Sequence, residues 1–290
     1  MKKKKGKKKD KLSSVLLIVI LIAGLSLLLY PSFSDYWNSI HSSRAIASYS
    51  DTVAAMDTSQ NDALLAAARA YNSRIKLRPS VYTMSDEEKQ EYRDTLDITG
   101  TGIMGYVDIP AIKCTLPIYH STDESVLQIA AGHLEWTSLP VGGKGTHTVL
   151  SGHRGLPSAK LFSDLDKIVE GDQFLIRVLQ EVFTYEVDQI LIVEPEDISS
   201  LTIDADRDQC TLVTCTPYGI NTHRLLVRGH RVANSEEART LTVSSEATLV
   251  DTRVVAGAIA IPVLFILLMM STFSESKARR KRRILKEVRR

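Results

Sequence analysis

Residues suited to covalent chemistry gather in one stretch, residues 211–231, which reads TLVTCTPYGINTHRLLVRGHR. Its first half alternates as a short strand that ends at Cys215, and a loop rich in turn-forming residues follows. A second strand, Leu225–Val232, is predicted to begin just after Arg224. A thiol at a strand end could attack a carbonyl group, and the guanidinium nine positions later could stabilise the oxyanion that forms.

The chain contains three cysteines, and their surroundings differ. Cys114 lies in an apolar segment and Cys210 inside the predicted strand, so both are predicted to be buried structural residues. Cys210 and Cys215 are five positions apart, so their side chains point to opposite faces of one strand and cannot easily form a disulfide. Cys215 is therefore the candidate nucleophile.

A thiol is mostly protonated at neutral pH and needs a basic or cationic neighbour to react as a thiolate. His153 is the first candidate, because it follows a predicted strand and stands between Gly152 and the pair Arg154-Gly155, where backbone freedom can direct an imidazole into a cleft. Residue chemistry alone leaves the other six histidines as alternatives: His41, His120, His133, His147, His223 and His230.

Arg224 is the candidate donor of hydrogen bonds to the oxyanion, although an arginine on a strand is more commonly a surface cation. Arg228 and Arg231 compete with it on the same predicted strand. Arg228 could share a face with Arg224, because alternate residues of a strand point to the same side. The chemistry of the three arginines does not by itself separate them.

No metal or cofactor is predicted. The sequence contains no Cys-x-x-Cys pair, no His-Glu-x-x-His motif and no Walker A loop. The glycine-rich segment Gly142–Gly145 is predicted to be a turn between strands.

The part of the chain that carries these residues, from Gly100 onward, is predicted to be mainly β. Many short strands with few helices are typical of a closed barrel or a sandwich. The predicted strands, besides the two that flank the Cys215 loop, are Ile103–Ile109, Cys114–Tyr119, Thr146–Ser151, Gln173–Val178 and Thr184–Val193. Glu124–Ala131 and Leu161–Ile168 are predicted to be helical pieces.

A helical segment is predicted ahead of the β-rich part. Four apolar residues recur at helical spacing, namely Ile46, Tyr49, Val53 and Met56, and residues 62–75 continue the pattern. Pro79 interrupts it. Ser85 and Glu88 then fit a capping box, which predicts a short helix to about Leu96. A packing spacer and a regulatory element are both open interpretations of this segment.

Charge and hydropathy predict a membrane protein. Residues 1–30 hold eight lysines and one aspartate, and residues 253–290 hold ten basic and two acidic residues, which leaves 18 basic and 31 acidic residues in 31–252. Each basic tail adjoins an apolar run, Val15–Tyr30 or Val254–Met270, of a length that can cross a bilayer. This arrangement favours a membrane over nucleic acid as the partner of the basic tails.

The positive flanks predict that both termini are cytoplasmic and that residues 31–252 are extracellular. A cleaved signal peptide is the alternative for the first run. Its one A-x-A site, Ala45-Ile46-Ala47, lies some 15 residues beyond the apolar stretch, which is too far for cleavage of that kind. We therefore expect two retained transmembrane helices.

The motifs around the candidate residues resemble those of a known enzyme family. The pattern Thr-Leu-Val-Thr-Cys ending at Cys215, with Arg224 nine residues later and His153 in Ser-Gly-His-Arg-Gly 62 residues earlier, resembles the sortases. The longer form of the stretch is most similar to class C, the pilin-polymerising branch. The resemblance runs from about Gly102 to Arg231, nearly half of the chain.

This resemblance implies an eight-stranded β-barrel with short helices, and it implies that His153, Cys215 and Arg224 are the catalytic residues. Thr214 is a candidate substrate-binding residue. The implied reaction cleaves an LPxTG-like sorting signal between Thr and Gly through a thioester, and transfers the acyl group to a lysine amine of a pilin subunit. The implied host is Gram-positive, and the implied partners are pilins or other proteins with such signals.

Two features depart from the class C pattern. Many class C sortases carry an Asp-Pro-aromatic motif in a lid ahead of the barrel, but none of the nine prolines here follows an aspartate. Arg78-Pro79-Ser80-Val81-Tyr82 stands in the corresponding region without matching it, so the lid is expected to be altered or absent. Trp136 stands where the family resemblance leads us to expect a small residue.

Three alternatives remain at this point. The first is a sortase that attaches proteins to the cell wall, against which the second apolar run argues. The second is a non-catalytic extracellular binding module on the same fold, which would have no reason to keep all three catalytic residues. A papain-like hydrolase is the third, but its cysteine lies near the start of the mature chain.

The predicted organisation has seven parts. They are a basic cytoplasmic tail (1–12), a transmembrane helix (13–30), an extracellular helical or lid-region segment (31–100), a catalytic barrel (101–234), a linker (235–252), a second transmembrane helix (253–273) and a second basic cytoplasmic tail (274–290).

Overall fold

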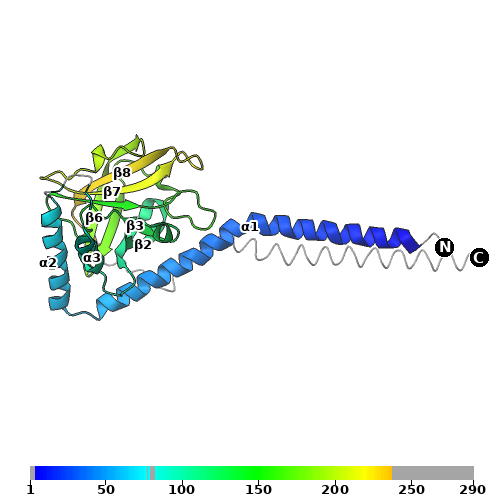
Figure 1. Cartoon of the computed structure of the whole chain (residues 1–290), viewed down its shortest axis with the longest axis horizontal. Helices are drawn as coiled ribbons and strands as arrows, with labels where there is room; N and C mark the ends of the chain where they lie inside the picture. The colour runs from blue at the N-terminus through cyan, green and yellow to red at the C-terminus, as the bar shows by residue number, and fades with distance from the viewer. Residues whose placement is uncertain (1–3, 77, 79–81, 237–290) are drawn as a thin grey trace, which may run out of the picture. The chain divides into compact units, whose positions relative to one another are not determined.

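The structure is a computed structural model that describes residues 4–76, 78 and 82–236 (Figure 1). The chain divides into two compact units, and the boundary between them falls after Tyr36, within the first helix. The unit that begins at Trp37 contains the β-rich part and the candidate catalytic residues.

Eight strands of the described residues form a closed barrel in the order β1-β2-β3-β4-β7-β8-β6-β5. Most neighbours are antiparallel, but β2 with β3 and β4 with β7 are parallel. The strands are β1 (Ile103–Ile109), β2 (Cys114–His120), β3 (Ala131–His133), β4 (Thr146–Ser151), β5 (Gln173–Val178), β6 (Glu181–Val193), β7 (Asp208–Thr216) and β8 (His223–Val232). The expected mainly β, eight-stranded barrel is thus confirmed.

The barrel interior is filled by the inward-facing residues of these strands. Phe174 of β5 and Tyr185 of β6 are fully buried and stack with their ring centroids 5.6 Å apart. Gly229 of β8 lies against them, and a Cβ atom at that position would stand 2.9 Å from the Phe174 ring. This packing holds β8 closely against β5 and β6, and β8 is the strand that carries Arg224.

Three helices precede the barrel: α1 (Lys4–Ala54), α2 (Thr58–Ile75) and α3 (Asp86–Asp94). Ile46, Tyr49 and Val53 form the buried face of α1, as their helical spacing predicts. The Tyr49 hydroxyl donates to the carbonyl of Met104 and accepts from the amide of Leu179, so it links α1 to two parts of the barrel. The end of α1 is therefore an integral part of the folded domain.

The other two helices, α2 and α3, begin with capping boxes and are also attached to the barrel. The predicted capping box of α3 is present, with the Ser85 hydroxyl accepting from the amide of Glu88 and the Glu88 carboxylate accepting from the amide of Ser85. In α2 the side-chain amide of Asn72 bonds to both the amide and the carbonyl of Leu139. Helices α2 and α3 therefore cover the barrel (Figure 1) as parts of one hydrophobic core.

Several element boundaries differ from those predicted. The helix expected over Glu124–Ala131 is only α4 (Glu124–Leu127), and Ala131 begins the short strand β3. Pairing of this strand with β2 and β4 overrides local helix propensity. Gly132 lies so close to the carbonyl of Ser121 that a Cβ atom there would be 2.4 Å from the oxygen. Within Leu161–Ile168 the structure has one 3₁₀ turn, Leu165–Lys167.

Helix α1 also runs through Pro31, where the sequence predicts the end of the transmembrane helix. Proline removes one intrahelical hydrogen bond, yet the helix continues to Ala54. Among the described residues one helical segment, Leu16–Ala54, is long and apolar enough by length and composition to cross a membrane, and an 18-residue window within it has a mean hydropathy of 2.4. The second predicted span, 253–273, and most of the predicted linker lie outside the described residues.

Candidate active site

Cys215 is the eighth of the nine residues of β7 and is partly exposed. The other two cysteines, Cys114 and Cys210, are buried, and none of the three forms a disulfide. Burial raises the pKa of the Cys210 thiol well above its ordinary value, so that thiol remains protonated and unreactive. The structure thus leaves Cys215 as the accessible thiol of the three.

Arg224 lies directly opposite Cys215 across the β7–β8 pair. The loop between the strands reverses the chain with positive φ angles at Gly219 (74°) and Asn221 (62°), conformations that Gly and Asn adopt more readily than other residues. One guanidinium nitrogen of Arg224, Nη1, donates to the carbonyls of Asn221 and His223 at 3.3 and 3.2 Å. The predicted pairing of a thiol with a guanidinium across one loop is therefore present.

The two competing arginines are occupied elsewhere. Arg228 donates from Nε to Asp188 Oδ1 at 2.9 Å. Arg231 donates to the carbonyls of Val182 and Thr184, both at 3.1 Å. Both pair with residues of β6, away from the level of Cys215, so Arg224 is the arginine of the three that lies beside the thiol.

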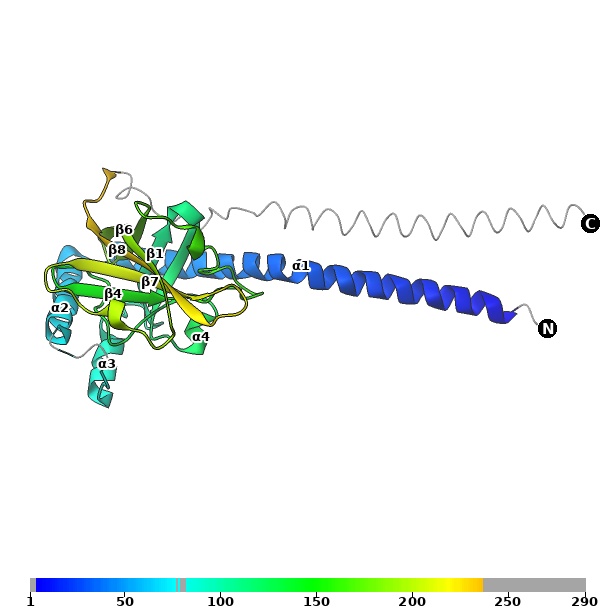
Figure 2. The same cartoon turned by 90° about the horizontal axis from the view of Figure 1, so that it is seen from above.

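His153 follows β4, the strand that lies parallel to β7 (Figure 2). The residues on either side of it bond to the residues on either side of Cys215. The Gly152 carbonyl accepts a bond of 2.7 Å from the Thr214 hydroxyl, and Arg154 donates to the Thr216 hydroxyl at 3.2 Å. The backbone at His153 therefore stands level with Cys215, and the barrel order β4-β7-β8 places His153, Cys215 and Arg224 on three neighbouring segments.

The structure assigns three other histidines to buried structural contacts. His120 bonds through its two ring nitrogens to the carbonyls of Gly102 and Thr95. His147 bonds to the Thr202 carbonyl and to the Thr211 hydroxyl. His133 is fully buried, bonded to the Tyr92 hydroxyl at 2.9 Å and to the Ser138 carbonyl at 2.9 Å.

The remaining histidines have partners away from the thiol or lie on the helical segment. His41 is an exposed residue of α1. His223 and His230 face the carboxylates of Glu194 and Asp188 at 3.3 and 3.7 Å. His223 stands opposite Thr216, so it points to the other face of the sheet from Cys215 and Arg224, which leaves His153 as the candidate histidine beside the thiol.

The buried His133 predicts a pH dependence of stability. Burial lowers its pKa from 6.5 to about 4, because desolvation disfavours the charged ring more strongly than the bond to the Ser138 carbonyl favours it. Between these values the unfolded chain binds a proton that the folded chain does not, so stability falls as the pH drops from 6.5 to 4. We expect a loss of about 3 kcal/mol in unfolding free energy over this window.

Urea unfolding of the chain in detergent solution at pH 7 and pH 4.5 measures this loss. His133→Gln should reduce the pH dependence, whereas the matched change at the partly exposed His230, His230→Gln, should leave it as it is. Equal pH dependence in the native chain and the His133 variant would contradict the assignment.

Glu124, at the start of α4, is a neighbour of the site that the sequence does not reveal. Its Oε2 lies 3.5 Å from Nε2 of His153. A hydrogen bond from Gln128 and, secondarily, the adjacent His153 lower the pKa of the Glu124 carboxyl, which keeps it ionised at neutral pH. Nothing in the local sequence distinguishes this exposed carboxylate from its neighbours, because its approach to His153 depends on tertiary structure.

Thr214 is buried, and its hydroxyl is used in the bond to Gly152 that aligns β7 with the His153 segment. Its predicted contact with substrate stays a prediction. Trp136 is partly buried and packs against the small apolar cluster of Val149, Leu201 and Leu226.

The lid region lies largely outside the described residues, since residues 77 and 79–81 are not described. At its borders, the Arg78 guanidinium lies 4.5 Å from the ring centroid of Tyr82. Both side chains also bond to the carboxylate of Glu88 on α3. This segment is therefore attached to α3 at each end.

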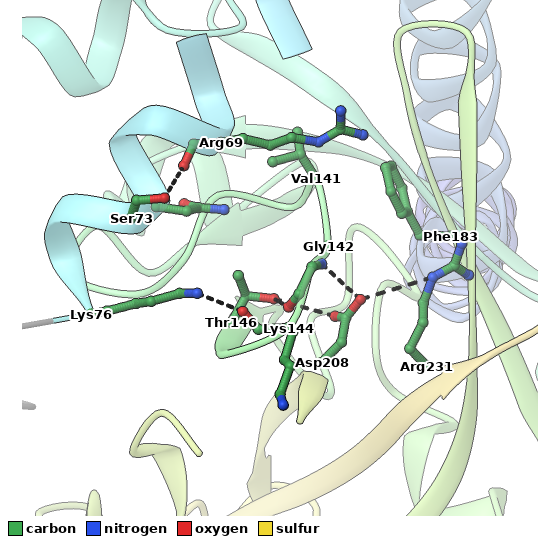
Figure 3. A pocket seen from close by; sticks show the side chains of 12 residues that line it. Arg69, Ser73, Lys76, Val141, Gly142, Lys144, Thr146, Phe183, Asp208 and Arg231 are labelled. Carbon is green, nitrogen blue, oxygen red and sulfur yellow. Dashed lines mark hydrogen bonds and ion pairs between the residues drawn. The ribbon is translucent and has the colours of Figure 1, made fainter. Parts of the chain in front are cut away.

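A separate hollow of about 520 Å³ lies at the other end of β7 (Figure 3). It is bordered by α2, by the Gly142–Gly145 turn and by Asp208, the first residue of β7. Asp208 is seven residues from Cys215, about 23 Å along an extended strand. Its carboxylate is occupied by the Gly143 amide at 2.8 Å and the Tyr185 hydroxyl at 3.0 Å.

The predicted turn at Gly142–Gly145 is confirmed, because positive φ angles at Gly142, Gly143 and Gly145 reverse the chain before β4. The hollow beside it contains none of the three predicted catalytic residues. Within the described residues, no group of three or more His, Cys, Asp or Glu side chains is arranged to hold a metal ion.

Comparison with known proteins gives a consistent result. The sortase domain family matches residues 107–232. Sortase D of Bacillus subtilis (strain 168) is 31% identical over 131 residues, which are 44% of this chain and 63% of that protein. Sortase A of Bacillus anthracis is 29% identical over 130 residues, 45% of this chain and 60% of that protein. The chain thus spans less than two thirds of the length of these curated relatives.

The similarity to solved structures is more extensive. Sortase C1 from Streptococcus agalactiae is 52% identical, with a TM-score of 0.65, and the match covers 66% of this chain and 100% of that structure. Sortase C of Streptococcus pneumoniae, whose structure was described for its catalysis and pilin substrate specificity, is 46% identical with a TM-score of 0.60. That match covers 66% of this chain and 97% of the other. These two structural neighbours are class C sortases.

Proposed function

Because the chain belongs to the sortase family, whose members are cysteine transpeptidases, we propose that it is a membrane-anchored class C enzyme that joins pilin subunits. The observation that carries the proposal is the alignment of three adjacent barrel segments. Cys215 on β7 faces Arg224 on β8, and His153 is held level with Cys215 by bonds on both sides. The catalytic roles below are part of the proposal.

In the first half-reaction the Cys215 thiolate attacks the carbonyl between Thr and Gly of an LPxTG-like sorting signal. The tetrahedral intermediate collapses as the C–N bond breaks. The protonated His153 imidazole gives its proton to the departing amine. The products are a thioester on Cys215 and the released C-terminal part of the signal.

In the second half-reaction a lysine amine of another pilin subunit attacks the thioester. Neutral His153 accepts a proton from this amine, the C–S bond breaks, and Cys215 leaves as a thiolate. An isopeptide bond forms, and the enzyme returns to its thiolate and imidazolium state. Atoms and charges balance without any cofactor.

Arg224 is proposed to stabilise the oxyanion of both tetrahedral intermediates. Its Nη1 is directed by the two loop carbonyls, which leaves other donors of the guanidinium for a substrate oxygen. Donors fixed in advance are most effective where negative charge develops, because they need no reorganisation during the reaction. The loop between β7 and β8 therefore sets the direction of these donors.

The membrane location rests on the apolar part of α1 and on the basic residues before it. We propose that this helix anchors the enzyme and that the second apolar run, 253–273, is a second span. With both basic tails in the cytoplasm, the barrel would stand outside the cell, where sorting signals of exported pilins are presented. A pilin acceptor, rather than the cell wall, is favoured by the similarity to class C structures.

The function is tested with the full chain in detergent micelles, an LPxTG-type peptide and a lysine-bearing pilin fragment. We expect cleavage of the peptide and an isopeptide-linked product that accumulates in proportion to the lysine donor. Mass spectrometry identifies the linkage, and a donor with its lysines replaced by arginine serves as the matched control.

The outcomes separate the alternatives. Product with a cell-wall peptide amine but none with the pilin lysine would favour a wall-anchoring sortase. Peptide release to water at the same rate with and without donor would mean that the enzyme is a hydrolase. Peptide binding without cleavage would contradict the proposed enzymatic function and would favour a binding module.

A further inference from the structure

Arg154 has a buried, positively charged side chain close in sequence to the proposed catalytic residues. The proposed mechanism gives this side chain no role. Arg154 directly follows His153, and its side chain is only 7% exposed. A buried guanidinium is costly unless its hydrogen bonds and charge are satisfied. The Nε of Arg154 is buried without a hydrogen-bond partner, so the contacts of its two Nη atoms and of its planar face must hold the group in place.

Each contact of Arg154 reaches a different segment around Cys215. Its Nη1 donates to the Thr216 hydroxyl, next to Cys215, at 3.2 Å. Its Nη2 forms an ion pair with Asp166, in the 3₁₀ turn Leu165–Lys167. The guanidinium carbon lies 5.7 Å from the ring centroid of Tyr218, in the loop that leads to Arg224.

These contacts connect the three proposed catalytic segments. Arg154 is covalently attached to His153, it bonds to the residue after Cys215, and it stacks on the loop before Arg224. Gly155 lies against the same tyrosine, since a Cβ atom there would be 3.2 Å from the Tyr218 ring. A displacement of the His153 segment relative to β7 would therefore have to break the Arg154 contacts.

We propose that Arg154 is a positioning residue that fixes the distance of the His153 imidazole from the Cys215 thiol and orders the β7–β8 loop. This inference rests on the proposed function and adds a fourth side chain to it. The planar fork of arginine is required, because it bonds to Thr216 and Asp166 while its face stacks on Tyr218, a combination that a lysine cannot reproduce.

Kinetics of the full chain in detergent micelles test the proposal, with the peptide and lysine donor as substrates. We expect Arg154→Met and Arg154→Lys to lower kcat by about 30- to 100-fold, because a shift of about 1 Å between reacting groups has an effect of this size. KM for the peptide should change by less than about threefold, since Arg154 does not contact the substrate. A purely structural role would instead lower the amount of folded enzyme and leave kcat per folded molecule unchanged.

A second set of variants measures the coupling to β7. Thr216→Val removes the acceptor while keeping the shape of the side chain, and we expect it to lower kcat by about 5- to 10-fold. Because Arg154 and Thr216 act through one bond, the double variant should be no slower than Arg154→Met alone. Asp166→Asn, which changes a half-exposed partner, should lower kcat by less than about fivefold.

Two results would overturn the proposal while leaving the proposed function intact. One is a native chain that ligates the substrates and an Arg154→Lys variant that retains kcat within threefold. The other is a double variant whose fold-losses multiply, which would show that the two residues act independently. A native chain that forms no ligated product is the failure of the proposed function itself, so the two failures are distinguishable.

Discussion

Replacement of Cys215 by alanine is expected to abolish transpeptidation, with a loss on the order of 10⁴-fold or more in product formation. The reason is that alanine cannot form the thioester on which both proposed half-reactions depend. The measurement is the yield of isopeptide-linked product from the full chain, with the protein concentration and fold matched to those of the native enzyme.

The other two cysteines supply matched controls. Cys114 and Cys210 are buried on the same barrel and form no disulfide, so Cys114→Ala and Cys210→Ala should cost about 1 kcal/mol of stability each and change the rate per folded molecule by less than about threefold. A Cys215→Ala enzyme that still ligates would contradict the thioester mechanism. Loss of activity with equal severity in all three variants would show that folding, not chemistry, is being measured.

Replacement of His153 by alanine is the second large effect, a loss of about 10²- to 10⁴-fold in kcat. Without the imidazole, the proposed donor of a proton to the departing amine and acceptor of one from the lysine is missing. The expected loss is greatest for the peptide substrate and smaller for an activated thioester substrate, whose leaving group needs no proton. The ratio of the two rates, measured for the native chain and the variant, separates proton transfer from binding.

His223 is the control for this prediction, because it is partly exposed and adjoins Arg224 but pairs with Glu194. His223→Ala should retain kcat within about threefold. Equal loss in the two histidine variants would mean that the loop around Arg224, and not a specific acid–base group at His153, limits the reaction.

Most strands of the barrel could be predicted from sequence, because short apolar runs between Gly, Pro and polar turns specify them locally. The predicted bounds of β1, β4 and β5 agree with the structure at both ends. The strand β3 could not be predicted, since three residues have no periodicity and their extended form depends on pairing with β2 and β4. The buried face of α1, in contrast, follows directly from the spacing of its apolar residues.

The thiol and the guanidinium of the site could be predicted as a pair, because one hairpin joins them. The place of His153 could not be derived in this way, because β4 and β7 are parallel neighbours separated by more than fifty residues. The resemblance to the sortase family is what predicts His153 as the partner of Cys215. The distinction between Arg224 and Arg228 also needed the structure, since the ion pair of Arg228 with Asp188 joins two strands distant in sequence.

Arg154 and Glu124 show the limit of sequence patterns for the surroundings of a site. Arg154 stands beside His153, but a lone arginine before a glycine predicts only a surface cation. Its burial and its bond to Thr216 follow from the packing of three separate segments. Glu124 reaches His153 only because the short helix α4 ends next to β3, the strand that the sequence did not predict.

The claim that Cys215 carries the acyl group is tested most directly by locating the covalent intermediate. The full chain is incubated with the LPxTG-type peptide without a lysine donor, quenched in acid, digested and mapped by tandem mass spectrometry. We predict the acyl mass on the peptide containing Cys215, removable by hydroxylamine as a thioester should be. Product formation with the acyl group on any other residue, or with no acylated residue at all, would contradict the account.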